Sequence, residues 1–237
     1  MYYRKLVGLL IGLIVETLFL SLLNPANGLA ATSMVDFSHD KCVAKNSPLV
    51  APGLGYYSRA IIGVNGGGDW EINPCLKDEL QHAHSYALYV NTNYQSNQCN
   101  PHLSRRTAFN CGWDLGRWDV SYAGSQGAYS NTWFIDVETG PSIPWQEDDS
   151  LNATFLYGLA IGLQSAGVKV IGYYSTQDMW QYIVGSWHSN NYGWYATGSQ
   201  GPPSPSTIRT DCSTEFTGAR NIYYQYIMGD LDVDAPC

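Results

Sequence analysis

Asp136 and Glu138 are the two side chains whose type and spacing best fit acid–base chemistry. They close the run Trp133–Glu138, which reads as a strand buried on both faces, as in a parallel sheet. Side chains at positions i and i+2 of a strand point to the same face. Each carboxylate raises the proton affinity of its neighbour, so one group can stay protonated while the other is ionised. The pair predicts a general acid bordering a cleft. The alternative is that Asp136 caps the next helix and Glu138 forms a salt bridge.

The rest of the chain alternates between short apolar segments and helical patterns. We expect strands at Met34–Ser38, Ala60–Asn65, Tyr86–Val90, Trp133–Glu138, Val168–Tyr174, Tyr192–Ala196 and Ile222–Ile227. We expect helices at Pro74–Ser85, Trp113–Tyr122, Asp149–Ala166 and Thr176–Val184, with loops at Asn91–Cys111 and Gly201–Pro205. This alternation predicts an α/β fold with parallel strands. Because the later connections are short and contain few helices, an irregular (β/α) TIM-like barrel in a single domain fits better than an open sheet.

Polar residues at the carboxyl ends of barrel strands line the active face of such a fold. Several expected strands end in a polar side chain, so we expect these residues to meet at one rim: Asp36, Asn65, Asn91, Asp136, Glu138, Ser175 and the segment Asp230–Asp234. The number of carboxylates in this set supports the prediction of acid chemistry.

The first residues predict export. Two basic residues precede the apolar run Leu6–Leu23, and the small-residue pattern Gly28–Ala30 resembles a cleavage site. We therefore expect a signal peptide over 1–30, a barrel domain over 31–237 and secretion of the mature chain. The apolar run is also long enough to remain as an uncleaved membrane anchor.

Cysteine content agrees with an exported protein. All six cysteines follow the expected signal, and an even number in an exported chain suggests disulfides. The pairing cannot be derived from the sequence, and we expect Cys42–Cys75, Cys99–Cys111 and Cys212–Cys237. No Cys-x-x-Cys is present, which disfavours a zinc site or a redox dithiol.

Charge and motifs exclude several other functions. Without the first thirty residues the chain has ten basic and nineteen acidic residues, a formal charge of −9, and its only basic cluster is Arg105-Arg106. This disfavours nucleic-acid binding. Gly66–Gly68 lacks the spacing of a nucleotide loop, His82 and His84 are not spaced as helical metal ligands, and Asp230–Asp234 lacks the rest of a calcium loop. We expect no cofactor, no metal and a monomer.

The motifs resemble those of glycoside hydrolase family 25 lysozymes over nearly the whole mature chain. The similar segments are Val35–Ser38, Phe134–Glu138, Ile171–Ser175 with Trp180, Trp194–Ala196, and Tyr224–Tyr226 with Asp232. A further set resembles a group of exported, family-25-like bacterial proteins: Gly63–Gly67, Asn73–Leu76, Tyr89–Thr92 and Asp136–Gly140.

The resemblance implies hydrolysis of the β-1,4 bond between N-acetylmuramic acid and N-acetylglucosamine in peptidoglycan. By position, Glu138 would be the proton donor and Asp136 would stabilise the positive sugar or orient its 2-acetamido group. Asp36 and Asp232 would complete an acidic floor. Whether the reaction retains or inverts configuration stays open, because an i,i+2 pair fits either carboxyl separation.

Substrate contacts are expected from polar strand ends and from aromatic residues near them. The candidates are Asn65, Trp70, Asn91, Tyr174, Trp194 and Tyr226. For Trp70 and Trp194, packing in the core is as good an interpretation as stacking on a sugar. One segment departs from the family, because Asn65–Trp70 stands where these lysozymes carry a Glu-Gly element. That departure leaves open a barrel that binds peptidoglycan or another glycan without cleaving it.

Overall fold

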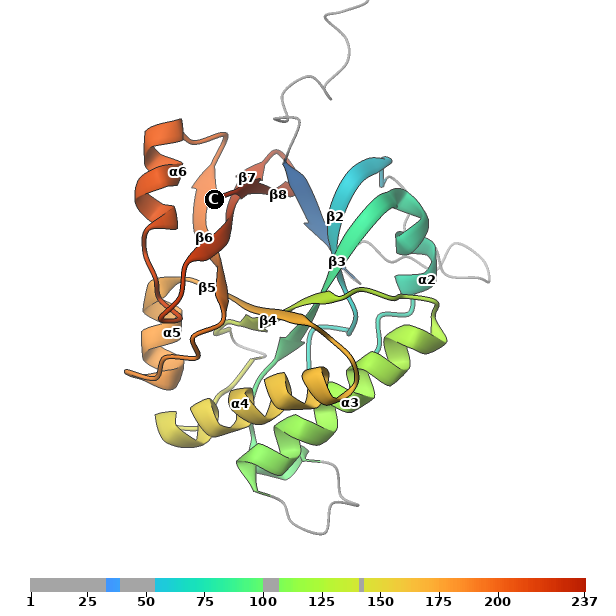
Figure 1. Cartoon of the computed structure of the whole chain (residues 1–237), viewed down its shortest axis with the longest axis vertical. Coiled ribbons are helices and arrows are strands. Elements are labelled where there is room, and N and C mark those ends of the chain that lie inside the picture. Colours follow the sequence, from blue (N-terminus) through green and yellow to red (C-terminus); the bar gives the residue numbers. More distant parts are fainter. Residues whose placement is uncertain (1–32, 39–53, 100–106, 141–142) are drawn as a thin grey trace, which may run out of the picture. The chain divides into compact units, whose positions relative to one another are not determined.

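Eight strands of the protein close into a barrel (Figure 1). The computed structural model describes residues 33–38, 54–99, 107–140 and 143–237, and Ser33–Cys237 form one compact unit. The strands are β1 Met34–Phe37, β2 Tyr57–Gly63, β3 Ala83–Thr92, β4 Thr132–Val137, β5 Val170–Ser175, β6 Tyr192–Gln200, β7 Asn221–Met228 and β8 Leu231–Pro236. Strands β1 to β7 pair in parallel, and β8 is antiparallel to both of its neighbours. The predicted irregular TIM-like barrel in a single α/β domain is confirmed.

The helices lie outside the barrel (Figure 1), and four of them begin at a side-chain cap. They are α2 Leu76–Glu79, α3 Ala108–Ser125, α4 Asp149–Ser165, α5 Gln177–Val184 and α6 Pro205–Cys212, with short 3-10 turns at η3 Leu80–His82 and η4 Ser96–Gln98. The side chains of Thr107, Asp148, Thr176 and Ser204 accept hydrogen bonds from the first turns of α3 to α6. Within the described ranges, no helix is long and apolar enough to cross a membrane.

Glycines let α3 and α4 pack closely side by side, as Figure 1 shows. A Cβ at Gly112 of α3 would collide with the Phe155 carbonyl oxygen, and one at Gly116 would lie 2.6 Å from the Leu159 carbonyl oxygen. On α4, Gly158 and Gly162 face the α3 backbone in the same way. The backbones of the two helices are therefore in direct contact.

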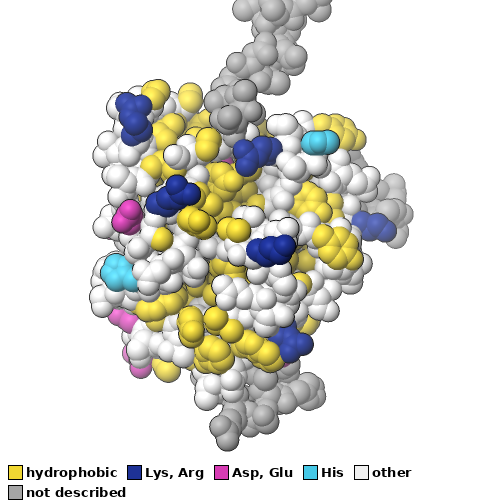
Figure 2. Space-filling model, viewed as in Figure 1, with side chains coloured by type: hydrophobic (Ala, Val, Ile, Leu, Met, Phe, Trp, Pro, Cys, Tyr) yellow, Lys and Arg dark blue, Asp and Glu magenta, His cyan; other side chains and the backbone are white. Residues whose placement is uncertain are grey.

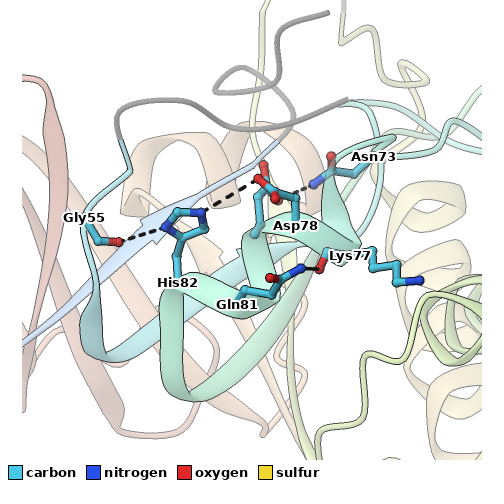
Figure 3. Close-up of polar contacts among 7 residues, drawn as sticks. Gly55, Asn73, Lys77, Asp78, Gln81 and His82 are labelled. Atoms are coloured by element: carbon cyan, nitrogen blue, oxygen red, sulfur yellow. Dashed lines mark hydrogen bonds and ion pairs between the residues drawn. The ribbon is translucent and has the colours of Figure 1, made fainter. Parts of the chain in front are cut away.

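The segment predicted as the helix Pro74–Ser85 is shorter than expected. The helix α2 and the turn η3 end at His82, and β3 begins at Ala83. His82 closes the segment, because its Nδ1 lies 3.1 Å from the Gly55 carbonyl oxygen and its Nε2 lies 3.7 Å from Asp78 Oδ2 (Figure 3). These contacts fix His82 against the residues that precede β2. The spacing of apolar residues, on which the helix prediction rested, gave no indication of these contacts.

Three other elements differ from the prediction. The expected loop Asn91–Cys111 contains the end of β3 and the first turn of α3, and the helix α6 follows the proline-rich segment. The acidic end of the chain forms β8. Gly229, with φ of 65°, turns the chain tightly between β7 and β8. Because β8 returns antiparallel beside β1, Asp232 lies opposite Asp36 in the register.

Two of the expected disulfides lie within the described residues. Cys99–Cys111 ties the segment after β3 to α3, and Cys212–Cys237 ties α6 to the end of β8. Cys75 is also disulfide-bonded, but Cys42, its expected partner, and the expected signal peptide lie outside the described residues. On the face drawn in Figure 2, the described Lys and Arg side chains stand apart from one another, with apolar side chains between them.

Candidate active site

A cavity of about 780 Å³ opens at the carboxyl ends of the parallel strands. Its walls carry the carboxyl groups of Asp36, Asp69, Glu71, Asp136, Glu138 and Asp232. Among the described residues that line it there is no Lys, Arg or His. The size is that of a site for a small molecule or a few sugar rings. The cavity is therefore acidic and disfavours polyanionic ligands.

Asp136 and Glu138 enter this cavity from the end of β4. Asp136 is almost fully buried, and Asn91 Nδ2 donates a hydrogen bond to its Oδ2. Glu138 follows the last residue of β4, and its carbonyl oxygen accepts a hydrogen bond of 2.7 Å from Trp145 Nε1. Both side chains line the same cavity, as expected for positions i and i+2. Within the described part of the chain, neither serves as a helix cap.

Asp36 and Asp232 reach the cavity from the first and the last strand of the barrel. They are register partners on β1 and β8, and both line the cavity. Gln225 of β7 donates from Nε2 to Asp36 Oδ2 at 2.9 Å, and its Oε1 accepts from the Tyr174 hydroxyl at 2.7 Å. Gln225 thus joins Asp36 to Tyr174. Sequence reasoning missed it, since its only signal was its place between Tyr224 and Tyr226 in a segment that resembles the closing strand of family 25 lysozymes.

The close carboxyl groups favour protonated forms. Burial and the nearby Asp232 raise the pKa of Asp36 to about 8, against the hydrogen bond from Gln225, which lowers it. Burial and the charges of Glu138 and Asp36 raise the pKa of Asp136 well above its usual range. Burial also raises the pKa of Glu138, while a hydrogen bond with Tyr174 lowers it. The group can therefore hold a proton near neutral pH, which a general acid requires.

Asn65 was expected to contact substrate, but its side chain is absent from the described cavity lining. Its side chain is fully buried, and both ends of its amide are hydrogen-bonded to the backbone of Asn91. Asn91 itself lines the cavity. The Asn65 side chain turns back to join the ends of β2 and β3, so its contribution to the cavity passes through Asn91.

The aromatic candidates divide between cavity wall and core. Tyr174 lines the cavity. Trp194 also borders it but is only 1% exposed, with its ring packed against Tyr89, Phe134 and Tyr174, so it forms the floor and offers no face for stacking.

Trp70 and Tyr226 are absent from the described cavity lining. Trp70 packs edge-on against Trp118 of α3, and Tyr226 is buried. Ser175 is also buried, and its hydroxyl donates to the Val137 carbonyl oxygen at 2.7 Å. Trp70 and Tyr226 therefore do not meet the proposed acids in the described cavity, and Ser175 does not reach the rim where it was expected.

A second acidic wall was not anticipated from the sequence. It comes from the segment after β2, where Asp69 and Glu71 line the cavity beside Gly66–Gly68. Asp69 Oδ1 accepts from the Thr92 hydroxyl at 2.6 Å and from the Asn93 amide at 3.4 Å. Burial raises the pKa of Asp69 to about 7. The one sequence feature that could have pointed to this wall is the segment Asn65–Trp70, which differs from the Glu-Gly element expected from the resemblance to family 25 lysozymes.

Asn73 holds this second wall in place. Its Nδ2 donates to the Gly63 carbonyl oxygen at 2.8 Å and to Glu79 Oε2 at 2.6 Å, while its Oδ1 accepts from the Cys75 amide at 3.0 Å. Figure 3 shows Asn73 reaching toward α2. The buried amide therefore closes the loop that carries Asp69.

Comparison with protein families gives a match over most of the barrel. Residues 57–216 match the family described as lysozyme-like protein 1 (Lys-1). Asp136, Glu138 and Tyr174 lie within the matched range, whereas β1 and β8, which carry Asp36 and Asp232, lie outside it.

Two curated relatives come from Dictyostelium discoideum. Probable GH family 25 lysozyme 4 is 38% identical over 93 residues, which cover 37% of this chain and 41% of the relative. Probable GH family 25 lysozyme 5 is 37% identical over 65 residues, which cover 27% of this chain and 30% of the relative. The chain thus aligns with less than half the length of each. These relatives give no support to the expected bacterial subgroup.

Solved structures share the fold at low sequence identity. The bacterial lysozyme from Streptomyces coelicolor superposes with a TM-score of 0.54 and 16% identity, covering 87% of this chain and 92% of that chain. The modular autolysin LytC from Streptococcus pneumoniae, in complex with a synthetic peptidoglycan ligand, superposes with a TM-score of 0.50 and 11% identity. The match covers 86% of this chain and 46% of the LytC chain. At these identities the similarity concerns the barrel.

Proposed function

Because the chain belongs to the lysozyme-like glycoside hydrolase family 25, we propose that it cleaves the β-1,4 bond between N-acetylmuramic acid and N-acetylglucosamine in bacterial peptidoglycan. The observation that carries the proposal is one cavity lined by Asp136, Glu138, Asp36 and Asp232. The peptidoglycan ligand named in the LytC structure agrees with this substrate class.

Glu138 is the proposed proton donor to the leaving oxygen. It is less enclosed than Asp136, and burial raises its pKa, which favours the protonated form that a general acid needs. Asp136 lies beside it and is held by Asn91, so its carboxyl group can face the sugar carbon that becomes positive. Asp36 and Asp232 add two further carboxyl groups to the same cavity, and each carries a negative charge when it is ionised. An oxocarbenium-like transition state is stabilised by such charges.

The rest of the cavity suits a glycan chain. Tyr89 and Tyr174 add aromatic surface, and Asn91, Asn93 and Gln225 add amide groups, which are the kinds of group that bind sugar rings and hydroxyls. The two described disulfides indicate an oxidising compartment. We propose that the protein is secreted after removal of residues 1–30 and acts as a monomer without a cofactor.

The direct test compares the wild type with Glu138→Gln and Glu147→Gln on purified peptidoglycan. Glu147 is exposed and absent from the described cavity lining, so its variant makes the same chemical change outside the site. We expect the wild type and E147Q to release reducing ends and muropeptides, and E138Q to be about 10²- to 10⁴-fold slower. Equal release by E138Q would remove Glu138 from the reaction.

A second candidate function is binding of a cell-wall glycan without cleavage. The segment Asn65–Trp70 motivates it, since this segment replaces the Glu-Gly element of the family and brings Asp69 to the cavity. Sedimentation with peptidoglycan, without any released reducing ends, would favour this function. Released muropeptides would exclude it, and cleavage of only a capsular or exopolysaccharide would reassign the substrate.

A further inference from the structure

Asp234 lies deeper in the barrel than the proposed catalytic acids and is fully buried. It is on β8, opposite Gln225 of β7 and Met34 of β1 in the register. Its Oδ1 accepts a hydrogen bond of 2.6 Å from Trp194 Nε1. Among the described residues, no donor lies within hydrogen-bond distance of its Oδ2. An ionised carboxylate would leave this buried oxygen without compensation, at a large cost in free energy.

The neighbour that a proton on Asp234 would reach is Asp36. The two side chains are close enough to share a hydrogen bond. Two ionised carboxylates have only acceptors and cannot form one, so the contact requires a carboxyl proton. With the proton on Asp234 Oδ2, its Oδ1 remains the acceptor for Trp194, and both oxygens of Asp234 have a partner.

The surroundings favour this placement of the proton over the reverse. Asp36 borders the cavity and receives the Gln225 amide N–H, which favours its ionised form. Asp234 is absent from the described cavity lining. Burial and the charge of Asp36 raise the pKa of Asp234 well above its usual range.

We propose that Asp234 is a positioning residue, held as a neutral carboxylic acid whose O–H donates to the Asp36 carboxylate. Asp234 stays protonated over the pH range in which Asp36 titrates, so it stabilises the ionised form of Asp36 and fixes its orientation toward the cavity. This inference rests on the proposed function for its effect on activity, because it concerns how one acid of that site is prepared.

The groups facing this pair are acids and tyrosines. Asp232 on β8 and Tyr226 on β7 interact electrostatically with Asp234. Glu138 and Asp136, at the end of β4, interact with Asp36. Each added negative charge favours retention of the proton on the most buried member, which is Asp234.

The experiment compares Asp234→Asn with Asp234→Val. Asparagine keeps the neutral charge, an acceptor for Trp194 and an N–H donor for Asp36, whereas valine keeps only the approximate shape. We expect D234N to retain most of the wild-type activity on peptidoglycan. We expect D234V to lose about 10- to 100-fold in kcat, the value of a hydrogen bond to a charged group, and its acid limb to move to higher pH because Asp36 loses a donor.

Carbon-13 NMR titration of the aspartate carboxyl groups tests the same point without substrate. In the wild type, the Asp234 signal is expected to remain in the protonated position while Asp36 titrates. Ionisation of Asp234 below Asp36, or a D234N variant as inactive as D234V, would overturn the inference. If the wild type cleaves no glycan, the proposed function fails, and the NMR titration alone decides the state of Asp234. If a variant does not fold, the titration of the wild type still shows whether Asp234 is protonated.

Discussion

Asn65 and Asn91 are joined by two hydrogen bonds across the ends of β2 and β3. Asn65 Nδ2 donates to the Asn91 carbonyl oxygen at 2.7 Å, and the Asn91 amide donates to Asn65 Oδ1 at 3.0 Å. The Asn91 side chain then donates to Asp136. A fully buried residue therefore fixes the partner of a proposed catalytic acid without lining the cavity.

The first prediction concerns this pair. Asn65→Leu removes both hydrogen bonds and leaves the Asn91 backbone groups unpaired, which is expected to cost about 1–3 kcal/mol of stability per buried group. Because Asn91 would shift, kcat should fall while KM changes less. Thermal unfolding and kinetics on peptidoglycan measure the two effects. An N65L variant with unchanged stability and kcat would contradict this role.

The sequence predicted the elements whose pattern is local. Strands β3 to β5 have long apolar runs, and α4 has a capped helical pattern, so their existence followed from periodicity. Strand β8 was not predicted as a strand, because its alternating acids face the inside of the barrel. In most strands the polar side chains of such an alternating pattern face solvent. The sheet register, which a sequence does not display, makes those positions interior.

Prediction of the site was limited by side-chain direction. Asp136 and Glu138 were accessible to reasoning because i and i+2 on one strand share a face. The link from Asn65 to Asn91 was not accessible because the Asn65 side chain turns back to the backbone, and the choice between core packing and stacking for Trp194 stayed open because nothing local distinguishes the two. Asp69 was missed because its position depends on a loop held by Asn73.

The second prediction concerns the helix pair. Gly112→Ala places a Cβ against the Phe155 carbonyl oxygen, so α3 and α4 must separate, and overpacking of this kind costs about 1–3 kcal/mol. The matched control is Gly124→Ala on the same helix, where the new Cβ lies 3.7 Å from Tyr129. That variant should be neutral or more stable, by up to about 1 kcal/mol from helix propensity. Denaturant unfolding measures the free energy of unfolding of both variants. Equal values for G112A and G124A would contradict the close contact between the α3 and α4 backbones.

The third prediction is that acidic pH stabilises the fold. The pKa of Asp36 is raised to about 8 and that of Asp69 to about 7, so the native state binds more protons than the unfolded chain, where Asp titrates near about 3.9. The unfolding free energy must then fall as pH rises from about 4 toward 8. Melting temperatures at pH 5 and pH 8 measure this. Asp69→Asn should flatten the fall between about pH 4 and 7, and a melting temperature that rises over this range would refute the assignment.

The fourth prediction concerns the hydroxyl of Tyr174, whose single proton has two acceptors in reach. These are Gln225 Oε1 at 2.7 Å and the carboxylate of Glu138, whose pKa a hydrogen bond from Tyr174 lowers. Tyr174→Phe removes both contacts. The pKa of Glu138 should rise, and since a general acid acts in its protonated form, the alkaline limb of the pH–rate profile should move to higher pH. Loss of the oriented Gln225 should lower kcat by about 2- to 10-fold.

The matched control for Tyr174 is Tyr182→Phe, since Tyr182 is 75% exposed on α5 and absent from the described cavity lining. It should leave the pH profile and kcat unchanged. An alkaline limb in Y174F that stays in place or moves to lower pH would mean that the Tyr174 hydroxyl does not act on Glu138. A shift of equal size in Y182F would point to a general effect of tyrosine loss. A shift confined to Y174F would place the hydroxyl between Glu138 and Gln225, because only a group in contact with the acid changes its pKa through a hydrogen bond.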